Sequence, residues 1–163
     1  MVAQTLSDSQ TQLQTPIPTQ IVTALQTALA ERLVAVVLFG SQARGDADAE
    51  SDWDVLVIAN GLPEKAFDRH LFLKKALPSA CRGAVSMLAR TPEEFGQRVS
   101  SLYLDIVLDG QMLYDPYGYA AEKLNALRQW MKRVEIYRER SEAGDLWRWQ
   151  TEPTAPWVLS WGT

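Results

Sequence analysis

Apolar residues along the chain switch between helical spacing and unbroken runs. From Thr19 to Leu33 they recur at intervals of three or four residues, which predicts an amphipathic helix. Residues 34–39 are then apolar without interruption and rich in valine, the pattern of a strand covered on both faces. Residues 53–58, which are apolar without interruption from Val55, predict a second strand, and residues 84–88 predict a shorter third one. We therefore expect three strands in this part of the chain.

Further helices are predicted after the second strand. Residues 64–76 follow a turn at 60–63 and have the spacing of a helix. The segment Thr91-Pro92-Glu93-Glu94 combines a threonine cap, a proline at the first helical position and a glutamate at the third, which is the signature of a capping box. We expect the helix that starts there to continue to Gly110.

The last third of the chain predicts a short strand, a long helix and an aromatic tail. The strand is expected at 112–114, and the helix has an apolar stripe from Ala120 to Val134. The charged run from Arg133 to Arg140 is interpreted as the solvated end of that helix.

These elements favour an α+β fold, because the strands are too few for a Rossmann sheet. We expect a small mixed sheet of three to five strands flanked by helices, with a long helix and a tryptophan-rich tail at the C-terminus. The predicted organisation is a mobile N-terminal segment over 1–16, a folded domain over 17–140 and an aromatic tail over 141–163.

The tail contains four of the six tryptophans: Trp147, Trp149, Trp157 and Trp161. Tryptophan buries a large area and is enriched in interfaces. A segment this aromatic is not expected to stay loose in water. It packs either on the domain itself, which we favour, or on a partner.

Composition narrows the possible partners. The 163 residues carry a net charge of −4 without a basic stripe, so long nucleic acid is not an expected ligand. The single Cys81 excludes an internal disulfide and a cysteine-based zinc site. There is no apolar stretch of membrane-spanning length, and the first residues lack a signal-peptide pattern. We expect a cytoplasmic protein without a membrane contact.

The most informative polar residues open the second strand. Asp52 and Asp54 are two residues apart, so in a strand their carboxylates point to the same side, separated by about 6.6 Å along the chain. Hard oxygen ligands at this spacing suit a magnesium ion that bridges phosphates. Two adjacent like charges are also costly without a cation. Both residues are therefore candidate metal ligands and catalytic residues.

A glycine–serine turn closes the first strand, and ten residues separate its serine from Asp52. Gly40 removes the side chain where a phosphate would approach, Ser41 adds a donor, and Arg44 is a candidate phosphate contact. Chemistry of this kind depends on positioning and charge neutralisation. Either half alone is most simply a solvated turn, but the two together favour a nucleotide site.

This combination resembles the Gly-Ser…Asp-x-Asp signature of the DNA polymerase β-like nucleotidyltransferases, and within them the minimal nucleotidyltransferase (MNT) family. The resemblance covers most of residues 20–135, including the Thr91 segment and the stretch 109–115. It implies a nucleotidyltransferase domain over 17–140 that binds Mg-ATP. It also implies transfer of a nucleoside monophosphate, with AMP as the expected group, to a hydroxyl acceptor.

The chain departs from this family at one position. Members have a third aspartate on the third strand, five residues before the threonine of the Thr91 segment, where this chain has Ser86. Serine is a weak ligand and no useful base near neutral pH. Either the protein binds Mg-ATP but transfers slowly or not at all, or another carboxylate (Asp48, Glu50 or Glu93) takes the third place.

Two functions therefore stay open. One is an enzyme that transfers AMP to a hydroxyl group, with a protein side chain as a candidate acceptor. The other is a catalytically impaired nucleotide-binding antitoxin or regulator that acts by complex formation. The resemblance implies a helical HEPN-type toxin as the partner in either case. The sequence leaves the oligomeric state open, with a homo-oligomer among the alternatives.

Overall fold

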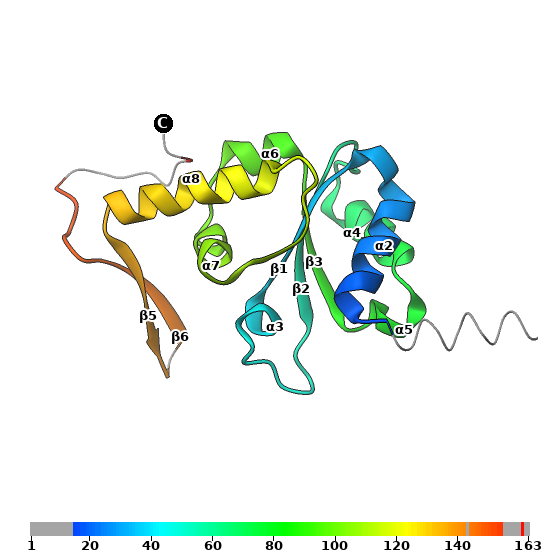
Figure 1. Ribbon diagram of the computed structural model, residues 1–163, viewed down its shortest axis with the longest axis horizontal. Helices are drawn as coiled ribbons and strands as arrows, with labels where there is room; N and C mark the ends of the chain where they lie inside the picture. The colour runs from blue at the N-terminus through cyan, green and yellow to red at the C-terminus, as the bar shows by residue number, and fades with distance from the viewer. Residues whose placement is uncertain (1–14, 143, 155–160, 162–163) are drawn as a thin grey trace, which may run out of the picture.

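The computed structural model describes residues 15–142, 144–154 and 161. Its main sheet has four strands in the order β3-β2-β1-β4. Strands β1, β2 and β3 of this sheet are labelled in Figure 1. The central β1 is antiparallel to β2 and β4, and β2 is parallel to β3. The strands are β1 (Leu33–Phe39), β2 (Trp53–Ala59), β3 (Val85–Arg90) and β4 (Gln111–Tyr114). The predicted mixed sheet is confirmed, and the predicted mobile segment lies almost entirely outside the described residues.

Helices cover both faces of this sheet, which confirms the α+β class (Figure 1). One layer contains α2 (Ile17–Leu29), α4 (Ala66–Ala76) and α5 (Ser79–Arg82). The other contains α6 (Pro92–Gln97), α7 (Ser101–Asp109) and α8 (Tyr119–Arg133). The 3₁₀ turn η1 (Ala30–Arg32) leads into β1, and the short α3 (Gly40–Arg44) follows it.

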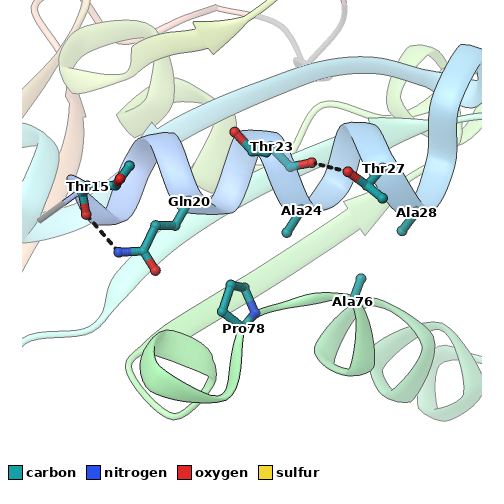
Figure 2. Close-up of a pocket in the computed structure, with 8 residues that line it drawn as sticks. All are labelled: Thr15, Gln20, Thr23, Ala24, Thr27, Ala28, Ala76 and Pro78. Carbon is teal, nitrogen blue, oxygen red and sulfur yellow. Dashed lines mark hydrogen bonds between the residues drawn. The ribbon is translucent and has the colours of Figure 1, made fainter. Parts of the chain in front are cut away.

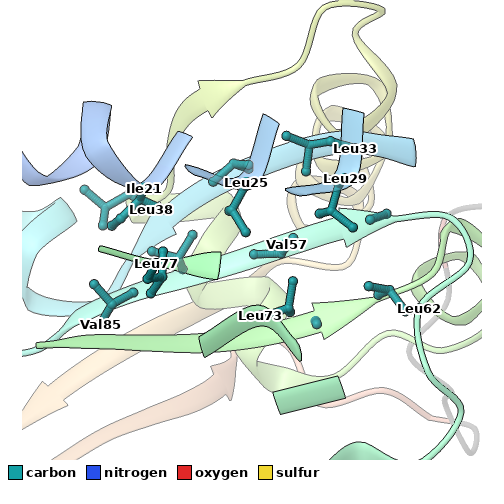
Figure 3. Packing of buried hydrophobic residues seen from close by; sticks show 14 of the residues in the cluster. Ile21, Leu25, Leu29, Leu33, Leu38, Val57, Leu62, Leu73, Leu77 and Val85 are labelled. Atoms are coloured by element: carbon teal, nitrogen blue, oxygen red, sulfur yellow. The ribbon is translucent and has the colours of Figure 1, made fainter. Parts of the chain in front are cut away.

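The alternation of side chains along the central strands creates two hydrophobic cores. On β2, Val55 and Val57 face the α2 layer, whereas Leu56 and Ile58 face the α8 layer. Figure 3 shows the first core, in which leucines of α2 and α4 pack onto β2. Because both faces are covered, a continuous apolar run can form a stable strand here.

The segment after Thr91 forms two helices where one was expected. The capping box is present: Thr91 Oγ1 accepts the Glu94 N–H, and the Glu94 carboxylate accepts the Thr91 N–H. However, α6 ends at Gln97, and Arg98 is extended at φ −134° and ψ 135°. The β-branched Val99 and the serines beyond it are weak helix formers. The break lets α7 change direction, so that Tyr103 packs edge-on against Phe95 at 4.9 Å.

The expected solvated helix end over Arg133–Arg140 is wrong. Helix α8 stops at Arg133, and Glu135 takes a left-handed φ of 55°. The chain then forms an antiparallel hairpin of β5 (Ile136–Ser141) and β6 (Gly144–Trp149). Contacts of alternate hairpin residues with α7 and the second core outweigh helix propensity in this stretch. The hairpin also spans the boundary set at 140/141.

The described tail tryptophans pack on the protein itself. Trp149 meets Trp130 of α8 at 6.4 Å between ring centroids, and Trp161 lies 4.7 Å from Phe95. Trp157 lies outside the described residues. Among the helices that the structure describes, none has the length and apolarity needed to cross a bilayer.

Candidate nucleotide site

Gly40 and Asp54 form the tightest feature of the predicted site. Gly40 lies between β1 and α3 with a left-handed φ of 72°. A Cβ atom added there would lie only 2.3 Å from Asp54 Oδ2. Glycine is therefore required twice, once for the backbone angle and once for the approach of the carboxylate. The strand register explains the contact, since Asp54 of β2 pairs with Phe39, the residue before Gly40.

Asp52 and Asp54 lie together at the start of β2. Burial raises the pKa of Asp54, and the negative charge of Asp52 raises it further, with Arg44 opposing. Trp53 between them packs into the opposite core. The charge repulsion between the two carboxylates favours a cation between them. Hard carboxylate oxygens are suitable ligands for magnesium, so these residues fit the expected ion.

Ser86 lies directly beside this pair. The parallel register of β2 and β3 places it opposite Asp54, and cross-strand partners point to the same face. Its side chain is exposed on that face, while its neighbours Val85 and Met87 turn to the other core. Position 86 is therefore a place from which an acidic side chain would reach the carboxylate pair, and serine occupies it.

None of the other candidate carboxylates is brought to this position. Asp48 accepts hydrogen bonds from Ser51 Oγ and the Glu50 N–H, which lower its pKa and tie it into its own loop. Glu93 belongs to α6, which follows the opposite end of β3 from Ser86. Within the described part of the chain, no three His, Cys, Asp or Glu side chains are grouped for a metal ion.

Helix α3 presents the remaining candidates. Ser41 and Arg44 lie on it, and Gly45 ends it in a left-handed turn at φ 79°. Phe39 at the N-cap offers no side-chain hydrogen bond to the first N–H groups of this helix. Arg44 Nε donates to Asp46 Oδ2 at 3.0 Å, and this bond lowers the pKa of Asp46. Arg44 is therefore near the site but paired with a carboxylate.

Sequence reasoning missed an arginine cluster beside α3. Arg138 on β5 donates to both oxygens of Asp109, at 2.6 and 3.0 Å, and to Asp105 at 3.1 Å. Two residues on, Arg140 Nη1 reaches to 4.0 Å from Asp46 Oδ2. The sequence does contain a signal for this hairpin, because strand-like runs lie on either side of Gly144, and the prediction of a helix end and a tail overlooks it.

A separate groove of about 490 Å³ lies between α2 and the segment joining α4 to α5 (Figure 2). Its described lining is uncharged and consists of Thr15, Gln20, Thr23, Ala24, Thr27, Ala28, Ala76 and Pro78. Helix α2 packs on the sheet face opposite Asp54, so the groove is distinct from the carboxylate pair. Nothing in its chemistry suits a metal-bound phosphate.

Comparison with known proteins decides the family. A family model described as a nucleotidyltransferase domain matches residues 19–137. The chain belongs to this family. The resemblance found in the Gly-Ser…Asp-x-Asp pattern is thereby confirmed, and the nucleotidyltransferase domain contains every predicted site residue. The match ends before Arg140.

Two similar proteins are the candidate protein adenylyltransferases MJ1305 and MJ0141 of Methanocaldococcus jannaschii. MJ1305 is 30% identical over 107 residues, which cover 63% of this chain and 73% of the relative. MJ0141 is 54% identical over 35 residues, which cover 22% of this chain and only 35% of that relative.

Solved structures show the same fold. A toxin–antitoxin crystal structure with AMP-PNP superimposes with a TM-score of 0.52 at 19% identity, covering 72% of this chain and 92% of that chain.

Proposed function

We propose that this nucleotidyltransferase binds Mg-ATP and transfers AMP to a hydroxyl group of a partner protein. The observation that carries the proposal is the carboxylate pair: Asp54 lies against the side-chain-free Gly40, and Asp52 is beside it. Asp54 adjoins the start of α3 and is close enough to Arg44 for their charges to interact. This arrangement brings an oxygen ligand set for a cation together with donors for the phosphates that the cation carries.

In this proposal each residue has one role. Asp52 and Asp54 hold the magnesium ion, which would neutralise the charge of the triphosphate. Ser41 and the backbone after Gly40 position the phosphates, with Arg44 as a further contact. The acceptor oxygen attacks the α-phosphorus and gives up its proton to water, while the bond to the β-phosphate oxygen breaks and pyrophosphate leaves. These residues act by orientation and electrostatics, without a covalent intermediate.

The comparisons support a protein acceptor and a nucleotide. MJ1305 is described as a candidate protein adenylyltransferase, and the chain matches most of its length. The similar toxin–antitoxin structure contains AMP-PNP, an ATP analogue. Together with the resemblance to minimal nucleotidyltransferases, they favour a HEPN-type toxin as the partner.

Binding is the first test. In Asp52→Asn/Asp54→Asn, magnesium-dependent ATP binding should fall by at least about a hundredfold, because both ligands of the cation lose their charge. Calorimetric titration with and without magnesium measures this. The matched control is Glu64→Gln/Asp68→Asn, which removes the same charge around the start of α4. Equal affinity in both double variants would show that the nucleotide binds elsewhere.

The second candidate is an antitoxin or regulator that binds nucleotide without transferring it. Ser86 favours it, because this neutral side chain is exposed directly opposite Asp54 where a third carboxylate would fit. Without a general base at position 86, the transfer reaction is expected to be slower by about a hundredfold or more than with a carboxylate there.

Ser86→Asp separates the two candidates. If the missing carboxylate limits transfer, the variant should label a partner protein from α-phosphate-labelled ATP at least about a hundredfold faster than the natural chain. Ser86→Asn is the neutral control of similar size. Fast labelling by the natural chain, with no gain in the variant, would remove the argument for an impaired protein. No labelling by any of the three chains would contradict the transferase proposal.

A further inference from the structure

Arg44 and Arg140 approach a single carboxylate oxygen from two elements. Arg44 Nε on α3 lies 3.0 Å from Asp46 Oδ2, and Arg140 Nη1 on β5 lies 4.0 Å from the same oxygen. One guanidinium belongs to the nucleotidyltransferase domain, whereas the other lies beyond residue 137, where the family match ends. Two arginines around one anionic oxygen are an arrangement that also binds a phosphate oxygen.

The strand that carries Arg140 is held in place from behind. Asp145 on β6 faces it in the hairpin register and lies 4.0 Å from Arg140 Nε. The same Asp145 oxygen lies 3.5 Å from Arg138 Nε. Arg138 is itself fixed on α7 by Asp105 and Asp109. The hairpin therefore cannot shift from α7 without breaking these bonds, and Arg140 is presented toward α3 by a rigid support.

The ion pairs of Asp46 are more exposed to solvent than those of Arg138. Asp46 is on an exposed turn after Gly45, and its side chain remains 49% exposed. Arg140 is 55% exposed. Exposed ion pairs of this kind contribute little, so an incoming polyphosphate, with more charge and more acceptor oxygens, can take the arginines from the carboxylate.

We propose that Arg140 is a second phosphate-contact residue of the nucleotide site, and that Asp46 stands in for a phosphate oxygen between Arg44 and Arg140 and gives way to one. The inference rests on the proposed function and deepens it. The ligand group is the β,γ-diphosphate of a nucleoside triphosphate, which leaves as pyrophosphate. The C-terminal hairpin thus completes a site that the family domain leaves open on this side.

The proposal predicts that substitutions of Arg140 and of Asp46 change the affinity for Mg-ATP in opposite directions. Arg140→Ala should weaken Mg-ATP binding roughly tenfold, the value of one charge-assisted hydrogen bond, and leave AMP binding unchanged. Arg140→Lys should recover part of the loss. Asp46→Asn should strengthen Mg-ATP binding severalfold, because it removes the anion that competes for both arginines. The control Arg148→Ala removes an exposed hairpin arginine that pairs with Glu139 on the other hairpin face.

Titrations with Mg-ATP, magnesium pyrophosphate and AMP measure these effects. Equal losses for ATP and AMP in Arg140→Ala would show a structural role and overturn the inference, as would no loss at all. Weaker ATP binding by Asp46→Asn would show that Asp46 positions Arg44 and does not compete for it. If Asp52→Asn/Asp54→Asn loses ATP while Arg140→Ala does not, only this inference falls. If the natural chain binds no Mg-ATP, the proposed function falls with it.

Discussion

Arg138 and Arg140 are two residues apart on one face of β5, yet their surroundings differ sharply. The Arg138 side chain is 7% exposed and makes paired hydrogen bonds to Asp109. Arg140 is 55% exposed, and both of its carboxylate contacts are at 4.0 Å. The hydrogen bonds that Arg138 donates to Asp109 and Asp105 hold its pKa above the ordinary value, despite the opposing effect of burial.

Arg138 therefore forms structural ion pairs, whereas those of Arg140 can be exchanged for contacts with a ligand. Removing one partner of a buried ion pair leaves the other charge unpaired in a poor solvent, which costs about 3–5 kcal/mol. An exposed pair contributes about 0–1 kcal/mol and can be replaced by a ligand without loss of the fold. A binding site can therefore use Arg140 only because Arg138 has already fixed the strand.

Arg138→Met is the strongest test of this contrast. It should lower the free energy of unfolding by about 3 kcal/mol, because Asp105 and Asp109 lose their buried counter-charge. Urea denaturation at neutral pH measures this loss. Arg148→Met is the matched control on the same hairpin and should change stability by no more than about 0.5 kcal/mol. Equal values for the two variants would mean that the Arg138 cluster does not hold the hairpin.

Asp54→Asn should change the free energy of unfolding less than Arg138→Met does, and in the opposite direction. The pKa of Asp54 is raised by burial and by Asp52, so the folded state binds this proton more tightly than the unfolded chain. Ionised Asp54 therefore costs stability at neutral pH, and the cost is recovered as the pH falls through its raised pKa. Without added magnesium, Asp54→Asn should be more stable than the natural chain by less than about 1 kcal/mol, because solvent screens the repulsion.

Thermal unfolding at neutral and at acidic pH measures this difference. The advantage of Asp54→Asn should shrink toward low pH, where the natural carboxyl is protonated. Excess magnesium should reverse the order, because only the natural chain gains the cation. A constant difference at every pH would assign the effect to packing and not to charge.

Much of the central sheet could be predicted because its signals are local. Continuous apolar runs predict β1 and β2, and the structure has both strands at these positions. The Thr91 capping box was also readable, since both of its hydrogen bonds join residues of the same turn. These features depend on neighbours a few positions apart, which a single sequence contains.

The C-terminal part could not be predicted in this way. Helix α8 was expected to continue, because the residues around Arg138 are good helix formers with helical charge spacing. The decisive partners of Arg138 are on α7, about thirty residues earlier in the chain, and no local pattern shows them. The same holds for Arg140 and Asp46. The prediction that this charged run is solvated surface therefore misses the contacts of Arg138 with α7 and the contact of Arg140 with Asp46.

The position of Arg69 has a consequence for self-association. Its guanidinium pairs with Glu94 and donates to the Ala89 carbonyl at 3.1 Å, at the outer edge of β3. Lys74 Nζ donates to the Val85 carbonyl near the other end of that strand.

The carbonyls of Val85 and Ala89 are four residues apart and point away from β2. They face the side on which another strand would pair with β3. Cations from α4 occupy them, so a foreign strand would have to displace a buried guanidinium before it could form its hydrogen bonds. The β3 edge of the sheet is thereby protected against templated aggregation.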